Sequence, residues 1–356
     1  MTDEESKPPP ARLRATWPRT VLINLLVFFG LLAAVEIAAR VYVAWSRGSQ
    51  TAGMQERTVY LSYKPYVMYG PDWDKALAPE QLPRRQGVCR VLMVGGSTAA
   101  GFPGSPLEQA LSARFGGQTF EVINAAQGGY EARQEVVVAA LWGPPIQPHV
   151  LLSLDGANDL EHRLRVRKAG EFYLNSTYEL FLTRPLIAPL GYLLAQSQLY
   201  NGMVRLSQRG RIGPVDQYAD AIPVYVEAQR SLNVLAKGMG SLRLMVLQPF
   251  SAFKTPLSSE EAAFGLYKYR EEVEKALYSR THDQLATLSA RDGVAYLDAR
   301  FIYQSVPERI FTDDVHLTPE GYGRLAEAIA SALADAVRGQ PEVCRSTKNA
   351  ARHALR

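Results

Sequence analysis

A serine at the end of a predicted strand is the first candidate for chemistry in this sequence. Ser97 follows the apolar run 91–94 and two glycines, which allow the chain to turn sharply. A hydroxyl placed there lies at the carboxyl edge of a parallel sheet, where open α/β folds bind ligands. Taken alone, the segment is more typical of a turn that caps the next helix. The case for a nucleophile therefore depends on the residues that accompany Ser97.

A histidine near the other end of the chain has the partner that a general base requires. His316 follows Asp313 by three residues and precedes a predicted helix start at Thr318. In a loop, this spacing lets the carboxylate hold one ring nitrogen while the other faces Ser97. Asp314 does not have this spacing. In isolation the segment could equally be a solvated turn. The remaining histidines lack such an arrangement, and we expect them at the surface or at strand ends: His149, His162, His282 and His353.

An asparagine after a second apolar strand could stabilise the negative charge that acyl transfer creates. Asn158 follows the run 150–154 and an Asp-Gly turn. Its amide can donate to an oxyanion beside backbone N–H groups, and loss of one such donor typically costs about 100- to 1000-fold in turnover. By itself the Gly-x-Asn-Asp pattern is a weak indication, since it also caps loops.

Five segments, in this order along the chain, resemble the motif blocks of the SGNH (GDSL-type) hydrolase family: VLMVGGST (91–98), VINAAQGG (122–129), LDGAND (154–159), LMVLQPF (244–250) and DDVHL (313–317). The resemblance implies a triad of Ser97, His316 and Asp313. It also implies an oxyanion hole formed by the Ser97 N–H, the Gly129 N–H and the Asn158 amide.

Two details qualify the resemblance. Gly128 is the alternative to Gly129, one residue away along the chain. The short family motif is Gly-Asp-Ser, whereas this sequence has Gly-Gly-Ser-Thr, with Gly96 in place of the aspartate. The substitution removes a carboxylate close to the nucleophile.

Strands and helices are predicted to alternate over residues 88–338, which favours a parallel sheet with helices on both faces. The helices are expected at 107–115, 131–142, 224–237, within 259–291 and at 319–338, and a last strand at 294–298. The resemblance implies an α/β fold with a three-layer, doubly wound, flavodoxin-like sheet of five strands in the order 2-1-3-4-5.

The sequence has no motif that predicts a cofactor, a metal or a nucleic acid. The glycines at 96 and 101 are followed by Phe102-Pro103 rather than by the Lys-Ser/Thr of a Walker loop, and they lack dinucleotide-binding spacing. No Cys/His cluster has zinc spacing. A net charge of +4 is too small and dispersed to indicate nucleic-acid binding. We therefore expect cofactor-free chemistry on an acyl ester of a small molecule, a lipid or a glycan.

The N-terminal region predicts a membrane anchor. Residues 21–35 contain one polar side chain, and the apolar character continues to Trp45. As a helix, the stretch from Trp17 to Trp45 would be about 42 Å long, which matches a bilayer with its headgroup layers. Glu36 and Arg40 are one turn apart and can pair. The alternatives are the buried helix of a soluble protein and a cleaved signal peptide.

These predictions divide the chain into a cytoplasmic N-terminus (1–19), a transmembrane signal anchor (20–45), a linker with a Tyr/Pro-rich lead-in (46–87), the hydrolase domain (88–338) and a basic C-terminal tail (339–356). Basic residues before the span slightly outnumber those after it, which favours a cytoplasmic N-terminus. We expect a single-pass protein of a bacterial cytoplasmic membrane with its domain in the periplasm. Nothing in the sequence indicates the oligomeric state.

A helical insertion is predicted at 160–223, where aromatic and aliphatic residues cluster directly after Asn158. Three interpretations are open for it: a lid or acyl pocket, a hairpin packed on the sheet edge, and a membrane-facing patch.

The two cysteines are predicted to lie at the edge of the sheet opposite Ser97. Cys89 begins the first strand, and Cys344 follows the last helix, which should run back to that edge. In an oxidising compartment a disulfide between them would contribute about 2–4 kcal/mol of stability. Two free thiols are the alternative.

We interpret the sequence as a membrane-anchored serine esterase that forms an acyl-enzyme. One alternative is an O-acetyltransferase that passes the acyl group to an envelope polysaccharide. Another is a catalytically inactive binding or scaffold protein, which the missing aspartate at Gly96 suggests.

Overall fold

The computed structural model describes residues 17–47, 63–164 except 79 and 84, single positions of the insertion (183, 197, 199, 200 and 203), 213–263, 270–338 and 344. Most of the predicted N-terminal segment, the first part of the linker, most of the insertion and nearly all of the basic tail lie outside these residues. The chain divides into two compact units, residues 1–51 with 184–208, and residues 52–183 with 209–356. We call the second unit the body.

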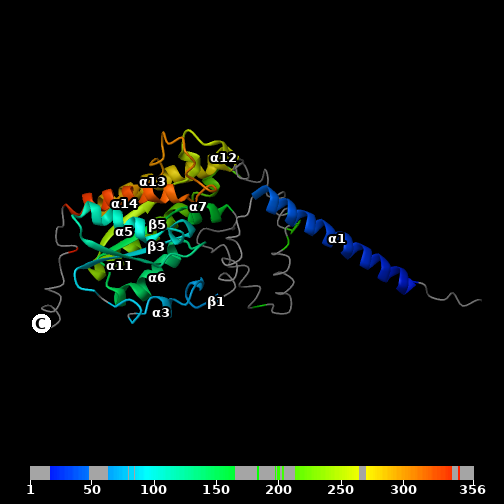
Figure 1. Ribbon diagram of the computed structural model, residues 1–356, viewed down its shortest axis with the longest axis horizontal. Helices are drawn as coiled ribbons and strands as arrows, with labels where there is room; N and C mark the ends of the chain where they lie inside the picture. Colours follow the sequence, from blue (N-terminus) through cyan, green and yellow to red (C-terminus); the bar gives the residue numbers. More distant parts are fainter. Residues whose placement is uncertain are drawn as a thin grey trace, which may run out of the picture. The chain divides into compact units, whose positions relative to one another are not determined.

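The body is built on a five-stranded parallel sheet flanked by helices (Figure 1). Its strands follow the order β4-β3-β5-β6-β7. The strands are β3 (Val88–Gly95), β4 (Thr119–Asn124), β5 (Val150–Asp155), β6 (Leu242–Leu247) and β7 (Ala295–Asp298). Numbered within this sheet, the order is 2-1-3-4-5, so the implied topology is confirmed. The central strands read as continuous apolar runs because both of their faces are buried.

Helices cover both faces of the sheet and make three layers. On one face α5 and α14 pack on side chains such as Val91, Met93 and Leu152. On the other face α6, α11 and α13 pack on alternate side chains such as Leu92, Leu151 and Met245. The helices are α4 (Ser97–Ala100), α5 (Gly104–Arg114), α6 (Ala132–Ile146), α7 (Ala157–Arg163), α11 (Ala221–Met239), α12 (Ser259–Ala262), α13 (Glu271–Asp292) and α14 (Pro319–Val337).

Part of the predicted lead-in packs on the body instead of linking to it loosely. A short hairpin, β1 (Tyr63–Lys64) with β2 (Met68–Tyr69), is followed by α3 (Trp73–Ala76). Tyr69 and Trp73 are buried against the α6 side of the sheet. The Tyr130 hydroxyl donates to the Tyr69 carbonyl at 2.7 Å and accepts from Trp73 Nε1 at 3.2 Å. The lead-in therefore supports the loop in which Tyr130 lies.

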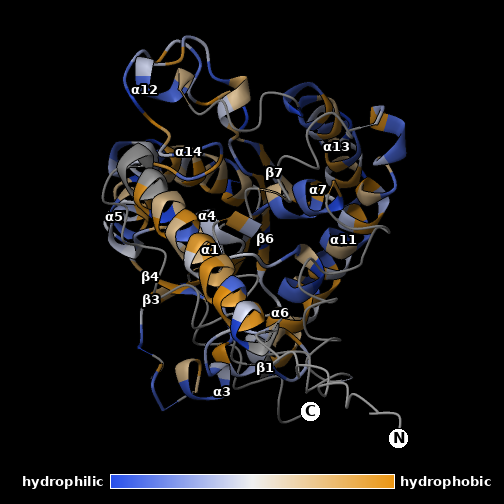
Figure 2. Cartoon of the chain, turned by 90° about the vertical axis from the view of Figure 1, so that its right-hand side faces the viewer, coloured by the Kyte–Doolittle hydropathy of each residue, from blue (hydrophilic) through white to orange (hydrophobic). Residues whose placement is uncertain are grey.

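The N-terminal helix, α1 (Trp17–Arg47), is apolar along most of its length (Figure 2). Its segment Arg19–Val41 is long and apolar enough to cross a membrane. Its large side chains are exposed, among them Leu26 (64%) and Phe29 (60%). The core helix of a soluble protein would bury side chains of this kind.

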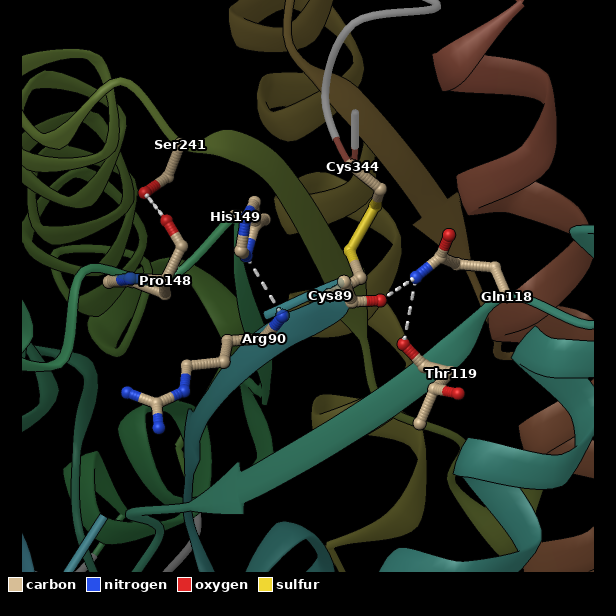
Figure 3. The surroundings of a disulfide bond; sticks show 9 residues. Cys89, Arg90, Gln118, Thr119, Pro148, His149, Ser241 and Cys344 are labelled. Carbon is tan, nitrogen blue, oxygen red and sulfur yellow. Dashed lines mark hydrogen bonds between the residues drawn. A yellow bond between two sulfur atoms is a disulfide. The ribbon is translucent and has the colours of Figure 1, made fainter. Parts of the chain in front are cut away.

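The predicted disulfide is present. Cys89 and Cys344 are bonded, with their Cα atoms 5.3 Å apart. Figure 3 shows the bridge at the start of β3, beside Thr119 at the start of β4 and close to His149, which precedes β5. This is the edge of the sheet opposite Ser97, as the sequence predicts.

Candidate active site

Ser97 lies where β3 ends and the short helix α4 begins. The two glycines before it are required by close approaches. A side chain on Gly95 would collide with the Leu154 carbonyl of the neighbouring strand, and one on Gly96 would collide with Asn158 Nδ2. The sharp turn thus brings the first block against the third and leaves Ser97 half-buried at the carboxyl edge of the sheet.

Ser97, His316 and Asp313 form a continuous hydrogen-bonded relay. Ser97 Oγ lies 2.7 Å from His316 Nε2, and His316 Nδ1 lies 2.6 Å from Asp313 Oδ2. The carboxylate can only accept from the ring, so Nδ1 carries the proton and Nε2 accepts from the serine hydroxyl. This is the tautomer that a general base needs to deprotonate a serine.

Backbone N–H groups of its own loop hold the Asp313 side chain in place. Its Oδ1 accepts from the backbone N–H groups of Val315 (3.0 Å) and His316 (2.8 Å), which leaves Oδ2 for the ring. Partial burial raises the pKa of Asp313, but the His316 hydrogen bond, the His316 charge and the two N–H donors outweigh it and hold the pKa below its ordinary value. The carboxylate therefore stays ionised beside the imidazole.

Asp314, the neighbour of Asp313, makes no hydrogen bond to the His316 ring. Its backbone carbonyl accepts from Ser251 N at 2.9 Å. Burial and the adjacent negative charge of Asp313 raise the pKa of its side chain to about 6. The two aspartates differ in the direction of their pKa shifts because only Asp313 has donors aimed at its oxygens.

The loop that carries the histidine is held by side chains from distant segments. Thr98 Oγ1 donates to the Val315 carbonyl at 3.2 Å and accepts from Gln248 Nε2 at 3.0 Å. Thr98 and Gln248 belong to the motif blocks 91–98 and 244–250, but the resemblance implies no role for either side chain. They join the nucleophile turn, the end of β6 and the base loop in one network.

A buried ion pair secures the start of the same loop. Glu261 Oε1 accepts from the backbone N–H groups of Ile310 (2.8 Å) and Phe311 (2.9 Å), while its Oε2 bonds to Lys254 Nζ. Burial opposes ionisation of Glu261, but Lys254 and the N–H donors overcome it and lower the pKa. The sequence gives no indication of this role, since Glu261 lies among other acidic residues on a predicted helix.

Asn158 lies beside the turn that carries Ser97. Its Nδ2 donates to the Tyr130 carbonyl at 2.7 Å and lies against Gly96, the residue before Ser97. The amide has a second N–H, and the Ser97 N–H lies in the first turn of α4, where a helix offers no acceptor. Gly129 is adjacent to Tyr130 and has φ +77°, a conformation that favours glycine.

The glycine at 96 is structurally coupled to this asparagine. Because a side chain at Gly96 would collide with Asn158 Nδ2, the amide occupies the space next to the turn that an aspartate would enter. Asp159 reinforces the arrangement, since both of its oxygens accept from the Ala132 N–H, at 3.1 and 3.3 Å. The third block is thereby tied to the residues that directly follow the second block, Tyr130 and Ala132.

A buried cluster of acidic side chains lies at the end of β5, close to Asn158 and Asp159. Asp155, at the end of β5, accepts from the Tyr225 hydroxyl and from Gln229 Nε2 (2.8 Å). Burial and the charge of Asp155 raise the pKa of Glu135 well above its ordinary value. Arg243 faces the same cluster, and burial lowers its pKa to about 10. The cluster fixes the strand end from which Asn158 extends.

The remaining histidines lie apart from the triad. His149 accepts from the Arg90 N–H at 2.9 Å at the opposite end of the sheet, which agrees with a strand-end position. His162 was expected at the surface or at a strand end, but it is buried in α7 and pairs with Glu131 at 3.0 Å. His282 pairs with Asp298 at 3.3 Å, and His353 lies outside the described residues. Within the described part of the chain, no group of three or more His, Cys, Asp or Glu side chains has the arrangement of a metal site.

Solved structures with partly similar folds include esterases. An acetyl xylan esterase, AlAXEase, is 12% identical, with 68% of this chain and 99% of that chain covered and a TM-score of 0.44. The acetylxylan esterase Axe2 of Geobacillus stearothermophilus is 12% identical over 68% and 93% of the two chains, with a TM-score of 0.41. A GDSL-like lipase candidate from Parabacteroides merdae is 14% identical over 70% and 97%, with a TM-score of 0.40.

No protein-family model matches the sequence, and no curated protein matches it. The architecture is defined by the strand order of the sheet and the positions of the five blocks around its carboxyl edge. The chain has the α/β fold that the resemblance to SGNH hydrolases implies.

Proposed function

We propose that this protein is a serine esterase of the SGNH type that works through an acyl-enzyme. The observation that carries the proposal is the unbroken relay from Asp313 through His316 to Ser97, with contacts of 2.6 and 2.7 Å. A structural serine at a helix start would have no need of a histidine oriented by a carboxylate. The scaffold alternative offers no reason for the three groups to meet.

In the proposed reaction Ser97 Oγ attacks the carbonyl carbon of an ester, and its proton passes to His316 Nε2. Asp313 keeps the imidazolium oriented and stabilises its charge. The carbonyl oxygen becomes an oxyanion, which accepts from the N–H groups of Ser97 and Gly129 and from the Asn158 amide. His316 then returns the proton to the leaving alcohol. Water, activated in the same way, hydrolyses the acyl-Ser97 ester and restores the hydroxyl.

The direct test is covalent labelling of the nucleophile. Wild-type protein should react with a fluorophosphonate probe and hydrolyse p-nitrophenyl acetate, and Ser97→Ala should lose both while keeping its far-UV circular dichroism. Ser259→Ala, an exposed serine on α12, is the matched control and should react as wild type. Labelling that persists in Ser97→Ala would refute the assignment. Turnover measured with and without a polysaccharide acceptor separates hydrolysis from acyl transfer.

We further propose that α1 anchors the enzyme in a bacterial cytoplasmic membrane with the body on the periplasmic side. The support is the exposed apolar surface of Arg19–Val41 and the Cys89–Cys344 disulfide, which suits an oxidising compartment. Full-length protein should remain in the membrane fraction after an alkaline carbonate wash. Release by that wash would contradict the anchor.

A further inference from the structure

One acidic side chain, Glu36, interrupts the apolar segment of α1. Glu36 lies within the segment Arg19–Val41, five residues before its end, which corresponds to a depth of about 7–8 Å along a helix axis. A charge at such a depth in a membrane is costly and is found paired or hydrogen-bonded. The partners of Glu36 therefore show what lies beside the helix at that level.

Glu36 binds both its own helix and a segment of the insertion. Its Oε1 accepts from Arg40 Nε at 2.8 Å. Its Oε2 accepts from Ser197 Oγ at 2.8 Å and from the Leu199 N–H at 3.0 Å. The Glu36 side chain is 20% exposed, whereas its neighbours Val35 and Ile37 are 49% and 61% exposed. The insertion thus covers the one acidic position of the predicted span.

The geometry at Ser197 is that of a helix start docked on the carboxylate. Ser197 Oγ donates to Glu36 and accepts from the Tyr200 N–H at 3.0 Å, the bond of an N-cap residue. The Leu199 N–H, which has no acceptor within its own first turn, is satisfied by Glu36 instead. A carboxylate at a helix N-terminus is also favoured by the helix dipole.

Two large side chains that follow Ser197 are exposed. Tyr200 is 43% exposed and Met203 is 61% exposed. These values resemble those of the lipid-facing candidates on α1, such as Val27 at 55%. Large apolar side chains next to a membrane-spanning helix are stabilised by lipid, and a tyrosine suits the interfacial layer.

We infer that Ser197, Leu199, Tyr200 and Met203 of the insertion lie in the membrane beside α1, held by the hydrogen bonds of Ser197 and Leu199 to Glu36, with Tyr200 and Met203 facing lipid. The inference rests on the proposed anchor and selects the membrane-facing interpretation of the insertion. The bilayer then holds the chain at two places, α1 and a segment that follows Asn158 in the sequence and precedes α11. A tether of one helix would leave the body free to turn about it, whereas two attachment points restrict that rotation.

The test uses full-length protein in vesicles of phosphatidylethanolamine and phosphatidylglycerol. Both native cysteines are in the disulfide, so a single introduced cysteine can carry a nitroxide spin label. The positions are Met203→Cys and Tyr200→Cys, with Val27→Cys of α1 as the lipid reference and Val234→Cys, exposed on α11, as the control on the body. The measurement is the ratio of label relaxation by oxygen, which dissolves in lipid, to relaxation by a water-soluble nickel chelate.

We expect labels at Met203 and Tyr200 to show a ratio several-fold above that at Val234 but below that at Val27, which lies nearer the middle of the span. A high nickel accessibility at Met203 would place it in water, and low accessibility to both reagents would place it against protein; either result overturns the inference while leaving the anchor intact. A water-like ratio at Val27 itself would refute the anchor and this inference with it.

The role of Glu36 in holding Ser197 and Leu199 is tested separately, in protein that carries the label at Met203→Cys. Glu36→Leu removes the acceptor for Ser197 and Leu199, so the label should shift toward the water-like ratio although carbonate extraction stays unchanged. Glu36→Gln keeps an acceptor oxygen and should retain the lipid-like ratio. An unchanged ratio in Glu36→Leu would show that Glu36 does not hold the segment.

Discussion

Ser97 and His316 meet at one point, but the two sides of the site are held in different ways. Ser97 follows β3, a fully buried strand with parallel neighbours on both sides. His316 lies in a loop closed by a single bridge between Phe311 and Leu317. Its partner Asp313 has a side chain that is 54% exposed. The register of the sheet therefore determines the position of Ser97, whereas hydrogen bonds from side chains largely determine the position of His316.

The difference predicts how substitutions on each side of the site affect activity. A substitution on the nucleophile side changes the chemistry but leaves a rigid frame. A substitution among the side chains that hold the base loop displaces His316, and catalysis fails because the base is no longer in position. The following variants separate these two kinds of effect.

The largest effect is expected for Asp313→Asn. The amide cannot hold His316 in the required tautomer, so kcat should fall by about 10,000-fold, as in triads of this type. Asp314→Asn should change kcat only a few-fold, because the Asp314 side chain does not contact the ring. Ester hydrolysis by the purified variants measures both. If the two aspartates behave in the opposite way, the register of the base is wrong by one residue.

The buried pair at the start of the base loop should matter next. Glu261→Gln leaves Lys254 uncompensated, and breaking a buried pair by removing one partner costs about 3–5 kcal/mol. We expect a lower free energy of unfolding in urea and a reduced kcat together. Glu260→Gln, at the exposed neighbouring residue, is the matched control and should be near wild type. A loss of stability with an unchanged kcat would show that the position of the base loop does not depend on the Glu261 contacts.

On the nucleophile side, Asn158→Ala should lower kcat by about 100- to 1000-fold with little change in KM, because its donor strengthens only when the oxyanion forms. Far-UV circular dichroism and the melting temperature should stay close to wild type, since the sheet frames this side. An effect confined to KM would reject the oxyanion role.

The smallest effect concerns the pH dependence of stability at Asp314. Its pKa in the folded state, about 6, exceeds its ordinary value of 3.8. The folded protein therefore holds this proton more tightly, and stability is lost as pH rises through about 4 to 6. Asp314→Asn removes that loss and should raise the free energy of unfolding at pH 8 by about 1 kcal/mol, given partial solvent screening. At pH 3, below the ordinary pKa of 3.8, it should have almost no effect. Equal differences at the two pH values would contradict the shift.

The same contrast explains how much the sequence predicts. The strands are visible as apolar runs, and Ser97, Asp313, His316 and Asn158 can be selected because their local spacing repeats a known pattern. The strand order could be predicted only from the resemblance to SGNH hydrolases, and the topology made the Cys89–Cys344 bridge possible but left two free thiols as the alternative.

What holds the base loop could not be predicted in this way. Thr98 reaches Val315 across 217 residues, and Gln248 reaches Thr98 across 150. Such bonds have no local periodicity, and a glutamate such as Glu261 is more often a solvated helix residue. The packing of the lead-in was hidden for a similar reason, because Tyr69 and Trp73 form no amphipathic pattern until they meet Tyr130.

The disulfide has a topological consequence for the whole site. Cys89 and Cys344 are separated by 255 positions, so the covalent bond closes the chain into one large ring. Ser97, Asn158 and His316 all lie on that ring. A single proteolytic cut anywhere along it opens the ring into a line but releases no fragment, and the nucleophile and its base remain parts of the same molecule until the bond is reduced.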